Sequence, residues 1–310
     1  MLNLNKPSVQ WFLLLLLAFV WGSSFILMKK GLLSYSSNQV ASLRILISFL
    51  FLSPIIIRNF RKIKKHQWWR VFVAGLLGSG IPAFLFPLAQ THISSSLAGM
   101  LNSLVPLFTV IIGLLFFKLG FRWLKLAGVI IGLIGAIGLL AATNKISASS
   151  TEIIYGSLVV LSTICYAINI NFIKKFLADI SSLNITSFGF LLIGPIAGTY
   201  LFTTDFIEIT TTQTDAPKHL FYIALLAIFG TALAVILFNM LIKKVSAVFS
   251  SSVTYIIPVF AIFWGVIDGE NILSSQLLFI GVILIGVYIV NRDNRLERKA
   301  EEKATAAKNL

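Results

Sequence analysis

The stretch LFPLAQTHISSSLAGMLNSLVP at residues 85–106 is matched later in the chain by LFNMLIKKVSAVFSSSVTYIIP at residues 237–258. The two stretches align at an offset of 152, which superposes Pro106 on Pro258. A second match, at an offset of 145, sets VWGSSFILMKK (20–30) over CYAININFIKK (165–175). Internal similarity at a nearly fixed offset is typical of a duplicated unit. We therefore expect the chain to consist of two related halves.

The composition is that of an integral membrane protein. Of the 310 residues, 57% are hydrophobic and 12% are charged, and the mean hydropathy is +0.93, so a folded globule would lack the polar surface it needs in water. A hydrocarbon core of ~30 Å takes about 20 apolar helical residues per crossing. Ten such stretches are found, at about 11–28, 39–57, 68–90, 95–117, 123–142, 153–173, 184–202, 220–242, 245–266 and 273–290.

These observations predict an all-α protein with ten transmembrane helices. We expect residues 1–142 to form the first five-helix repeat, residues 143–290 the second, and residues 291–310 a basic, mixed-charge tail. Because five is an odd number of crossings, the second repeat should run through the membrane in the opposite direction to the first. Two inverted repeats around a midplane site are typical of transporters.

The distribution of charge predicts the orientation. With the N-terminus placed in the cytoplasm, the inner segments hold 20 of the 25 Lys and Arg residues and the outer segments hold four. This bias predicts that both termini are cytoplasmic. The net charge of +14 is then explained by contact with anionic lipid at the cytoplasmic face, and we expect no nucleic-acid partner.

Polar residues gather at the two prolines that the alignment superposes. A proline within a helix leaves the carbonyl four residues earlier without its donor, which here means Asn102 and Thr254. Ser103 and Tyr255 are their neighbours. Unpaired backbone at mid-membrane depth is tolerated when it lines a wet cavity. We expect these four residues to line a substrate pathway, although kinks satisfied by neighbouring hydroxyl groups would explain the same pattern.

The second alignment adds Trp21 and Ser24 from one half and Tyr166 and Asn169 from the other. Asparagine facing lipid is costly, so Asn169 should point into the bundle. Aromatic rings beside hydroxyl and amide groups suit an organic solute with an apolar body and a few polar groups. Hydrogen bonds that merely hold helices together are the competing interpretation for each residue.

Two charged residues are candidates for anion or coupling contacts. Arg44 is the one formal charge embedded in an expected span, and we expect it to snorkel to the outer interface, with a contact to an anionic solute or an outer carboxylate as the alternative. No Asp, Glu or His lies in the middle of any expected span, which disfavours simple carboxylate-driven proton coupling. Glu270, just beyond the second proline helix, is the candidate for such a role.

The sequence offers no enzyme site. It contains no metal-ligand spacing, no phosphate-binding loop and no paired acidic constellation, so we expect no catalytic residues, no metal and no cofactor.

The motifs in their order resemble the drug/metabolite transporter superfamily, in its EamA-type ten-helix branch. The resemblance covers residues 11–290 and is carried by WGSSF (21–25), Arg44, SSSLAGMLNSLVPLFTVIIG (94–113) and SSSVTYIIPVFAIFWGVIDGE (250–270). It implies two EamA units in inverted orientation, a central pathway, alternating access, and export of amino acids or other small metabolites. One departure is visible, because the first half has Phe117-Lys118 where the second has Gly269-Glu270.

We therefore expect a multi-pass carrier of the bacterial inner membrane that exports a small, amino acid-like organic metabolite by alternating access. A lipid or lipid-linked sugar flippase is the alternative within transport. A non-transporting membrane scaffold or assembly factor is the alternative from another class. The sequence leaves the substrate's identity, the coupling ion and the oligomeric state open, with a monomer among the alternatives.

Overall fold

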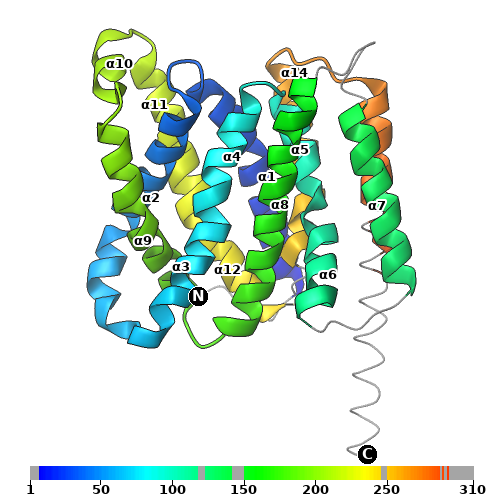
Figure 1. Ribbon diagram of the computed structural model, residues 1–310, viewed down its shortest axis with the longest axis horizontal. Helices are drawn as coiled ribbons and strands as arrows, with labels where there is room; N and C mark the ends of the chain where they lie inside the picture. The colour runs from blue at the N-terminus through cyan, green and yellow to red at the C-terminus, as the bar shows by residue number, and fades with distance from the viewer. Residues whose placement is uncertain are drawn as a thin grey trace, which may run out of the picture.

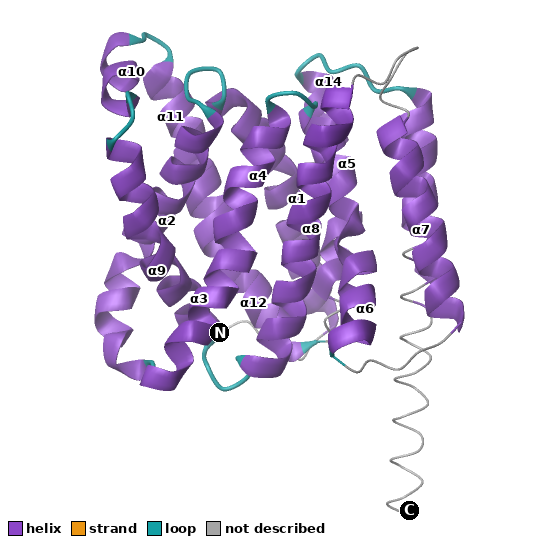
Figure 2. Cartoon of the chain, in the orientation of Figure 1, coloured by secondary structure: helices purple, strands orange, loops and turns teal. Residues whose placement is uncertain are grey.

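The computed structural model is entirely helical in the part of the chain that it describes, namely residues 7–117, 123–141, 150–245, 250–286, 288–289 and 292. The long helices stand side by side and run from one end of the molecule to the other (Figure 1), and Figure 2 shows helices joined by short loops across these described ranges. The N-terminal end of α1 lies at the lower end of the molecule in this view.

The first half contains seven α-helices. Two pairs of them, α3 with α4 and α5 with α6, are consecutive pieces of two long helical rods. They are α1 (Pro7–Gly31), α2 (Ser37–Asn59), α3 (Trp68–Gly75), α4 (Ile81–Gln90), α5 (Ser95–Leu101), α6 (Val105–Phe116) and α7 (Trp123–Ala141). Short 3₁₀ or π segments join some of them: η1 (Phe60–Lys62), η2 (Lys65–Gln67), η3 (Leu76–Gly80) and η4 (Asn102–Leu104).

The second half is also a series of helices with short 3₁₀ and π segments between them. Its helices are α8 (Ser150–Phe176), α9 (Ser182–Phe202), α10 (Phe206–Thr212), α11 (Ala216–Leu225), α12 (Ala234–Lys244) and α14 (Ile257–Ile267), with η5 (Leu226–Leu233) and η6 (Ser252–Tyr255) between them. A further apolar helix runs over Ser274–Gly286. The short helix α10 lies in the connection 203–219, which the sequence predicts to be a polar loop.

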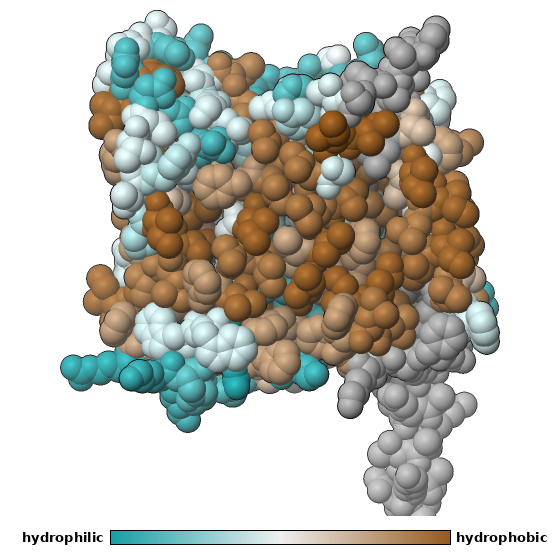
Figure 3. Space-filling view, viewed as in Figure 1, coloured by the Kyte–Doolittle hydropathy of each residue, from teal (hydrophilic) through white to brown (hydrophobic). Residues whose placement is uncertain are grey.

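Seven helical rods are long and apolar enough to cross a membrane: Ser8–Gly31, Ser37–Lys62, Lys65–Gln90, Ser95–Phe116, Thr151–Phe176, Ser182–Phe202 and Ala216–Lys244. Three shorter apolar helices, Leu126–Leu139, Val253–Ile267 and Ser274–Gly286, occupy the remaining expected stretches. Figure 3 shows a broad band of apolar residues across the middle of the visible face and polar residues toward its two ends. Together these features identify a multi-pass membrane protein.

The helices are interrupted at corresponding places in the two halves. Two π segments, η3 and η5, occupy residues 76–80 and 226–233, and two 3₁₀ segments, η4 and η6, precede Pro106 and Pro258. The π segment η3 ends at Gly80, one residue before α4 begins. The prediction that the carbonyl of Asn102 lacks a donor is wrong, because the 3₁₀ turn brings the Val105 N–H onto it.

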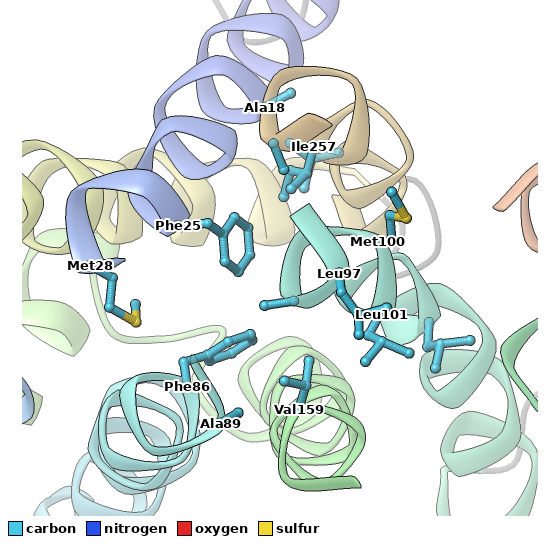
Figure 4. Packing of buried hydrophobic residues seen from close by; sticks show 14 of the residues in the cluster. Ala18, Phe25, Met28, Phe86, Ala89, Leu97, Met100, Leu101, Val159 and Ile257 are labelled. Atoms are coloured by element: carbon cyan, nitrogen blue, oxygen red, sulfur yellow. The ribbon is translucent and has the colours of Figure 1, made fainter. Parts of the chain in front are cut away.

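The buried core is built where large side chains from several rods meet. In Figure 4, Phe25 of α1 and Phe86 of α4 approach Leu97, Leu101 and Val159. The rings of Phe25 and Phe86 lie edge to face, with their centroids 5.6 Å apart. This cluster ties the first and last long rods of the first half to α8 of the second, so the halves share one core.

Close backbone approach fixes the position of α3 against α9. A Cβ added to Gly75 would lie 2.8 Å from the Cα atom of Gly189, and the three atoms nearest to it are all backbone atoms of Gly189, which cannot rotate away. Helices in lipid gain their packing from such small residues, because no hydrophobic force drives them together.

We predict that Gly75→Ala separates α3 from α9 and destabilises the protein by about 1–3 kcal/mol, the usual cost of overpacking. The measurement is the thermal unfolding midpoint of the purified protein in detergent. Gly281→Ala is the matched control, since its added methyl group meets nothing within 4 Å and the higher helix propensity of alanine should leave the midpoint unchanged or raised. Equal midpoints for the two variants would contradict the tight crossing.

Candidate functional site

An internal cavity of about 90 Å³ lies between the two halves. Its lining residues belong to α1, α2, η3, α4, η4, α6, α8, α12 and η6. Six of the eight residues that the sequence predicts for a substrate pathway line this cavity: Trp21, Ser24, Asn102, Tyr166, Asn169 and Thr254. They come from four separate rods, and residues far apart in the chain therefore meet at one point. Arg44 lines the same cavity.

The other two predicted residues are placed differently. Ser103 is fully buried and its hydroxyl group donates to the carbonyl oxygen of Met100 at 2.6 Å, which ties it to its own helix. Tyr255 is half-buried and packs against the main hydrophobic cluster. Neither is among the residues that line the cavity.

The π segments and the first rod of each half contact one another crosswise. Ser24 is the nearest neighbour of Gly230 in η5, and Asn169 is the nearest neighbour of Gly78 in η3. Ser24 aligns with Asn169, and Gly78 aligns with Gly230, at the two offsets found in the sequence. The indole N–H of Trp21 donates to the carbonyl oxygen of Gly230 at 2.9 Å. A π segment leaves such backbone groups available, which is why these segments are frequent at functional sites.

Arg44 is buried, and the expectation that it snorkels to the outer interface is wrong. Only 8% of the residue is exposed, and its Nε atom donates to the hydroxyl oxygen of Thr231 at 2.6 Å. The reason is packing: α2 lies between α9 and η5, so its buried face carries the side chain into the bundle. No carboxylate in the described part of the chain forms an ion pair with this guanidinium group.

Two amide oxygens in the cavity wall lack a donor. The Oδ1 atoms of Asn102 and Asn169 are buried and accept no hydrogen bond from any described group. A buried acceptor left unpaired costs about 1–3 kcal/mol, so such groups call for an explanation. Both oxygens would be satisfied by a ligand that offers N–H groups.

Aromatic side chains form much of the remaining wall. The rings of Phe86 and Tyr166 stack with their centroids 6.1 Å apart, and Trp21 meets Phe238 edge to face at 4.9 Å. The cavity therefore combines one cation, two free acceptors and an apolar surround, which is the usual make-up of a small-molecule site.

We call the end of the rods at Glu270 the outer end and the opposite end the inner end, following the orientation that the charge distribution predicts. At this outer end, Glu270 joins three helices through a set of contacts that we call the outer network. Its carboxylate accepts from the Nζ atom of Lys29 at 2.8 Å and from the backbone N–H groups of Ser95 and Ser96, each at 3.0 Å. Both serine hydroxyl groups also donate to it. Asp268 completes the network by pairing with Lys29 at 2.7 Å and with Lys30. The ends of α1 and α14 and the start of α5 are thereby held together.

The same contacts keep Glu270 ionised. Burial by itself would raise the pKa of its carboxyl group, but the hydrogen bonds from Lys29, Ser96 and Ser95 outweigh burial and lower that pKa from 4.5 to about 2. A carboxyl group with this pKa does not load and release a proton near neutral pH.

The inner end of the rods is closed by different chemistry. Lys174, which aligns with Lys29, donates to the carbonyl oxygens of Ile242 at 3.2 Å and Val245 at 2.5 Å. These carbonyls belong to the C-terminal end of α12, where cations are favourable partners for backbone groups that have no helical donor.

Sequence reasoning missed Thr231 and the two π segments. The signal that could have found them is the pair of glycines at 78 and 230, which recur at the offset of 152. Among the described residues, no group of three or more His, Cys, Asp or Glu side chains could hold a metal ion.

The model of the family described as "EamA-like transporter family" matches residues 10–141 and again residues 153–292. The chain belongs to this family. As an EamA-like protein it is a membrane transporter of the drug/metabolite transporter superfamily, and the names of its relatives indicate transport rather than catalysis.

Several relatives are similar along nearly their whole length. An "Uncharacterized transporter" of Archaeoglobus fulgidus is 28% identical over 91% of this chain and 99% of the relative, and the "Uncharacterized inner membrane transporter YedA" of Escherichia coli K12 is 25% identical over 87% of each. The "S-adenosylmethionine/S-adenosylhomocysteine transporter" of Chlamydia muridarum is 23% identical over 93% of each. A solved crystal structure that is 14% identical superposes with a TM-score of 0.67 over 94% of this chain and 100% of its own, which shows a shared fold.

We predict that Glu270→Gln lowers the thermal unfolding midpoint, and that this difference depends on pH. Because the folded pKa lies below 4.5, the ionised carboxylate stabilises the fold fully above pH 4.5, and the stabilisation is lost as the pH falls toward about 2. The midpoints of wild type and variant should therefore converge over that interval. Glu208→Gln, at an exposed position of α10, is the control that should show no such convergence.

Proposed function

We propose that this EamA-like protein carries a small, amino acid-like organic solute across the inner membrane by alternating access. The observation that supports the proposal is the cavity itself, where Arg44 has no carboxylate partner among the described residues and the Asn102 and Asn169 side-chain oxygens have no donor. A solute with a carboxylate and an ammonium group would satisfy all three.

The proposed architecture is ten crossings in two inverted five-helix repeats, residues 1–142 and 143–290, followed by the tail 291–310, which lies outside the described residues except for Arg292. Two features support it. The family model matches twice, once in each half, and the π and 3₁₀ interruptions recur at corresponding positions. The excess of Lys and Arg on one side supports cytoplasmic termini, with anionic lipid at that face.

The chemistry of the solute follows from the charges. A buried guanidinium group without a counter-ion is costly, and a bidentate carboxylate is the partner whose geometry matches it. The amide oxygens of Asn102 and Asn169 suit an ammonium group, and the rings of Trp21 and Tyr166 suit an apolar side chain. The named solutes of the Chlamydia relative also carry an α-carboxylate and an amine, which supports the same class here.

The size of the cavity supports a moving wall. Its volume of about 90 Å³ is well below the ~300–1,000 Å³ that is usual for small-molecule pockets. A solute can therefore enter only if the rods separate. The π segments η3 and η5 lie in two of the rods that would separate. The outer network holds the outer ends of α1, α5 and α14 together in this conformation. Export is the direction that we propose. The low pKa of Glu270 argues against this residue as a proton carrier.

The test is uptake of a pool of radiolabelled amino acids and related metabolites into proteoliposomes that contain the purified protein. We predict that Arg44→Gln and Asn102→Leu each lower transport by at least about tenfold, since each removes a charge-assisted or otherwise unpaired contact worth ~1.5–3 kcal/mol. Ser103→Ala is the control beside Asn102, because its hydroxyl group faces its own helix, and its transport should equal that of the wild type. Transport that survives Arg44→Gln unchanged would contradict the proposed solute chemistry.

A second candidate, lipid translocation, is favoured by one observation. An apolar groove of about 500 Å³ opens between α2, α4 and α9, and its lining includes Leu76 and Gly80 of η3, while Gly78 and Ser79 of the same π segment face the central cavity. One π segment thus separates the groove from the cavity. Dithionite quenching of fluorescent phospholipids in proteoliposomes tests this candidate: protein-dependent loss of the protected signal, blocked by Ala197→Phe in the groove, would favour a flippase. Folded protein without flux of any solute or lipid would favour a scaffold.

A further inference from the structure

In the outer network, five polar groups contact the single side chain of Glu270. Only 7% of the Glu270 side chain is exposed, yet it accepts from one ammonium group, two backbone N–H groups and two hydroxyl groups. The N–H groups belong to Ser95 and Ser96, which begin the rod that continues through Asn102 into α6. The contact therefore connects the outer surface with a rod that lines the cavity.

The matching position at the inner end has no such group. The alignment at an offset of 152, which superposes the two prolines, places Lys118 on Glu270, and the alignment at an offset of 145 places Lys29 on Lys174. Lys29 has two carboxylate partners, whereas Lys174 donates to neutral backbone carbonyls. The two ends of the carrier are thus closed by bonds of unequal strength, since hydrogen bonds between ionised groups are roughly twice as strong as those with neutral partners.

We propose that Glu270 and Lys29 form a latch that holds the outer side shut, so that the carrier rests closed to the outside and opens more readily toward the cytoplasm. This inference rests on the proposed alternating access. Opening the outer side would separate α1 from α5 and α14, which leaves the Ser95 and Ser96 N–H groups without an acceptor and the Glu270 carboxylate without its cation. Among the described residues of the inner end, no ion pair of this kind has to break for that end to open. Glu270 is thus a positioning residue that sets the resting state without touching the solute.

The experiment measures outer opening directly, without any solute. In a Cys165→Ser background, which removes the chain's single cysteine, Met28→Cys places a thiol in the cavity wall two turns along α1 from Trp21 toward its outer end. Met28 is 2% exposed, so a membrane-impermeant maleimide added from outside should react with it only when the outer side opens. The readout is the labelling rate in right-side-out vesicles.

We expect Glu270→Gln and Lys29→Met each to raise this rate by at least about tenfold. The double variant should gain less than the product of the two single increases, because both substitutions remove the Lys29–Glu270 pair that they share. Lys29→Arg, which keeps the charge and the hydrogen bond, should label at the unmodified rate. Glu208→Gln removes a carboxylate from an exposed outer helix and is the matched control, with no change expected. Size-exclusion profiles identify variants that fail to fold. If Glu270→Gln fails to fold, the comparison of labelling rates between Lys29→Met and Lys29→Arg tests the latch instead.

Two different results would overturn two different statements. Equal labelling rates for wild type, Glu270→Gln and Lys29→Met overturn the latch, even where solute transport is intact. If Met28→Cys, with Lys29 and Glu270 unchanged, labels from each membrane face as fast as a fully exposed thiol, the cavity is open to both faces at once. That result overturns alternating access, and with it the basis of the latch. Additive rate increases in the double variant would show two independent contacts and so overturn the latch as one unit.

Discussion

In hydrocarbon, every backbone N–H and C=O group must find a partner inside the protein, and this constraint shapes the whole molecule. It makes continuous helical rods the default, so each departure from the α-helix must be buried and bonded. Three of the departures, η3, η4 and η6, line one cavity. The π segment η5 bonds to two residues of its wall, Trp21 and Arg44. Gly230 illustrates the principle, because its carbonyl oxygen accepts from Trp21 of another rod. The broken helices thus create a site and are stabilised by the residues of that site.

Arg44 gives the cavity its chemical character. A guanidinium group bonded only to a threonine hydroxyl oxygen among its described neighbours lies beside two amide oxygens that have no donor. Each of these groups is costly when buried alone, and together they describe the complement of a zwitterion. The surrounding rings supply an apolar lining without any further charge. In the proposed function, these few unpaired polar groups select the solute.

In the proposed architecture of inverted repeats, the two ends of the carrier correspond to each other, yet their charged residues differ. Outside, the carboxylate of Glu270 holds Lys29 and the start of α5, and inside, Lys174 holds only backbone carbonyls at the end of α12. Duplicated halves alone would make the inward-open and outward-open states nearly equal in energy. The Phe117-Lys118 and Gly269-Glu270 difference removes that equality, and a membrane carrier with unequal ends has a preferred resting state.

Hydropathy alone determined that this is an all-helical membrane protein and where its apolar stretches lie, because lipid requires long apolar runs. The two internal alignments and the isolated polar residues within those runs identified six residues of the cavity wall. Tertiary structure decided the rest. Arg44 was predicted to reach the outer interface because one helix cannot reveal which face its neighbours cover. The sequence did not single out Thr231, which lies in a π segment and accepts a hydrogen bond from Arg44. Two partners of Glu270, Ser95 and Lys29, lie 175 and 241 positions away in the chain. Contacts between distant rods depend on their packing, which local pattern does not encode.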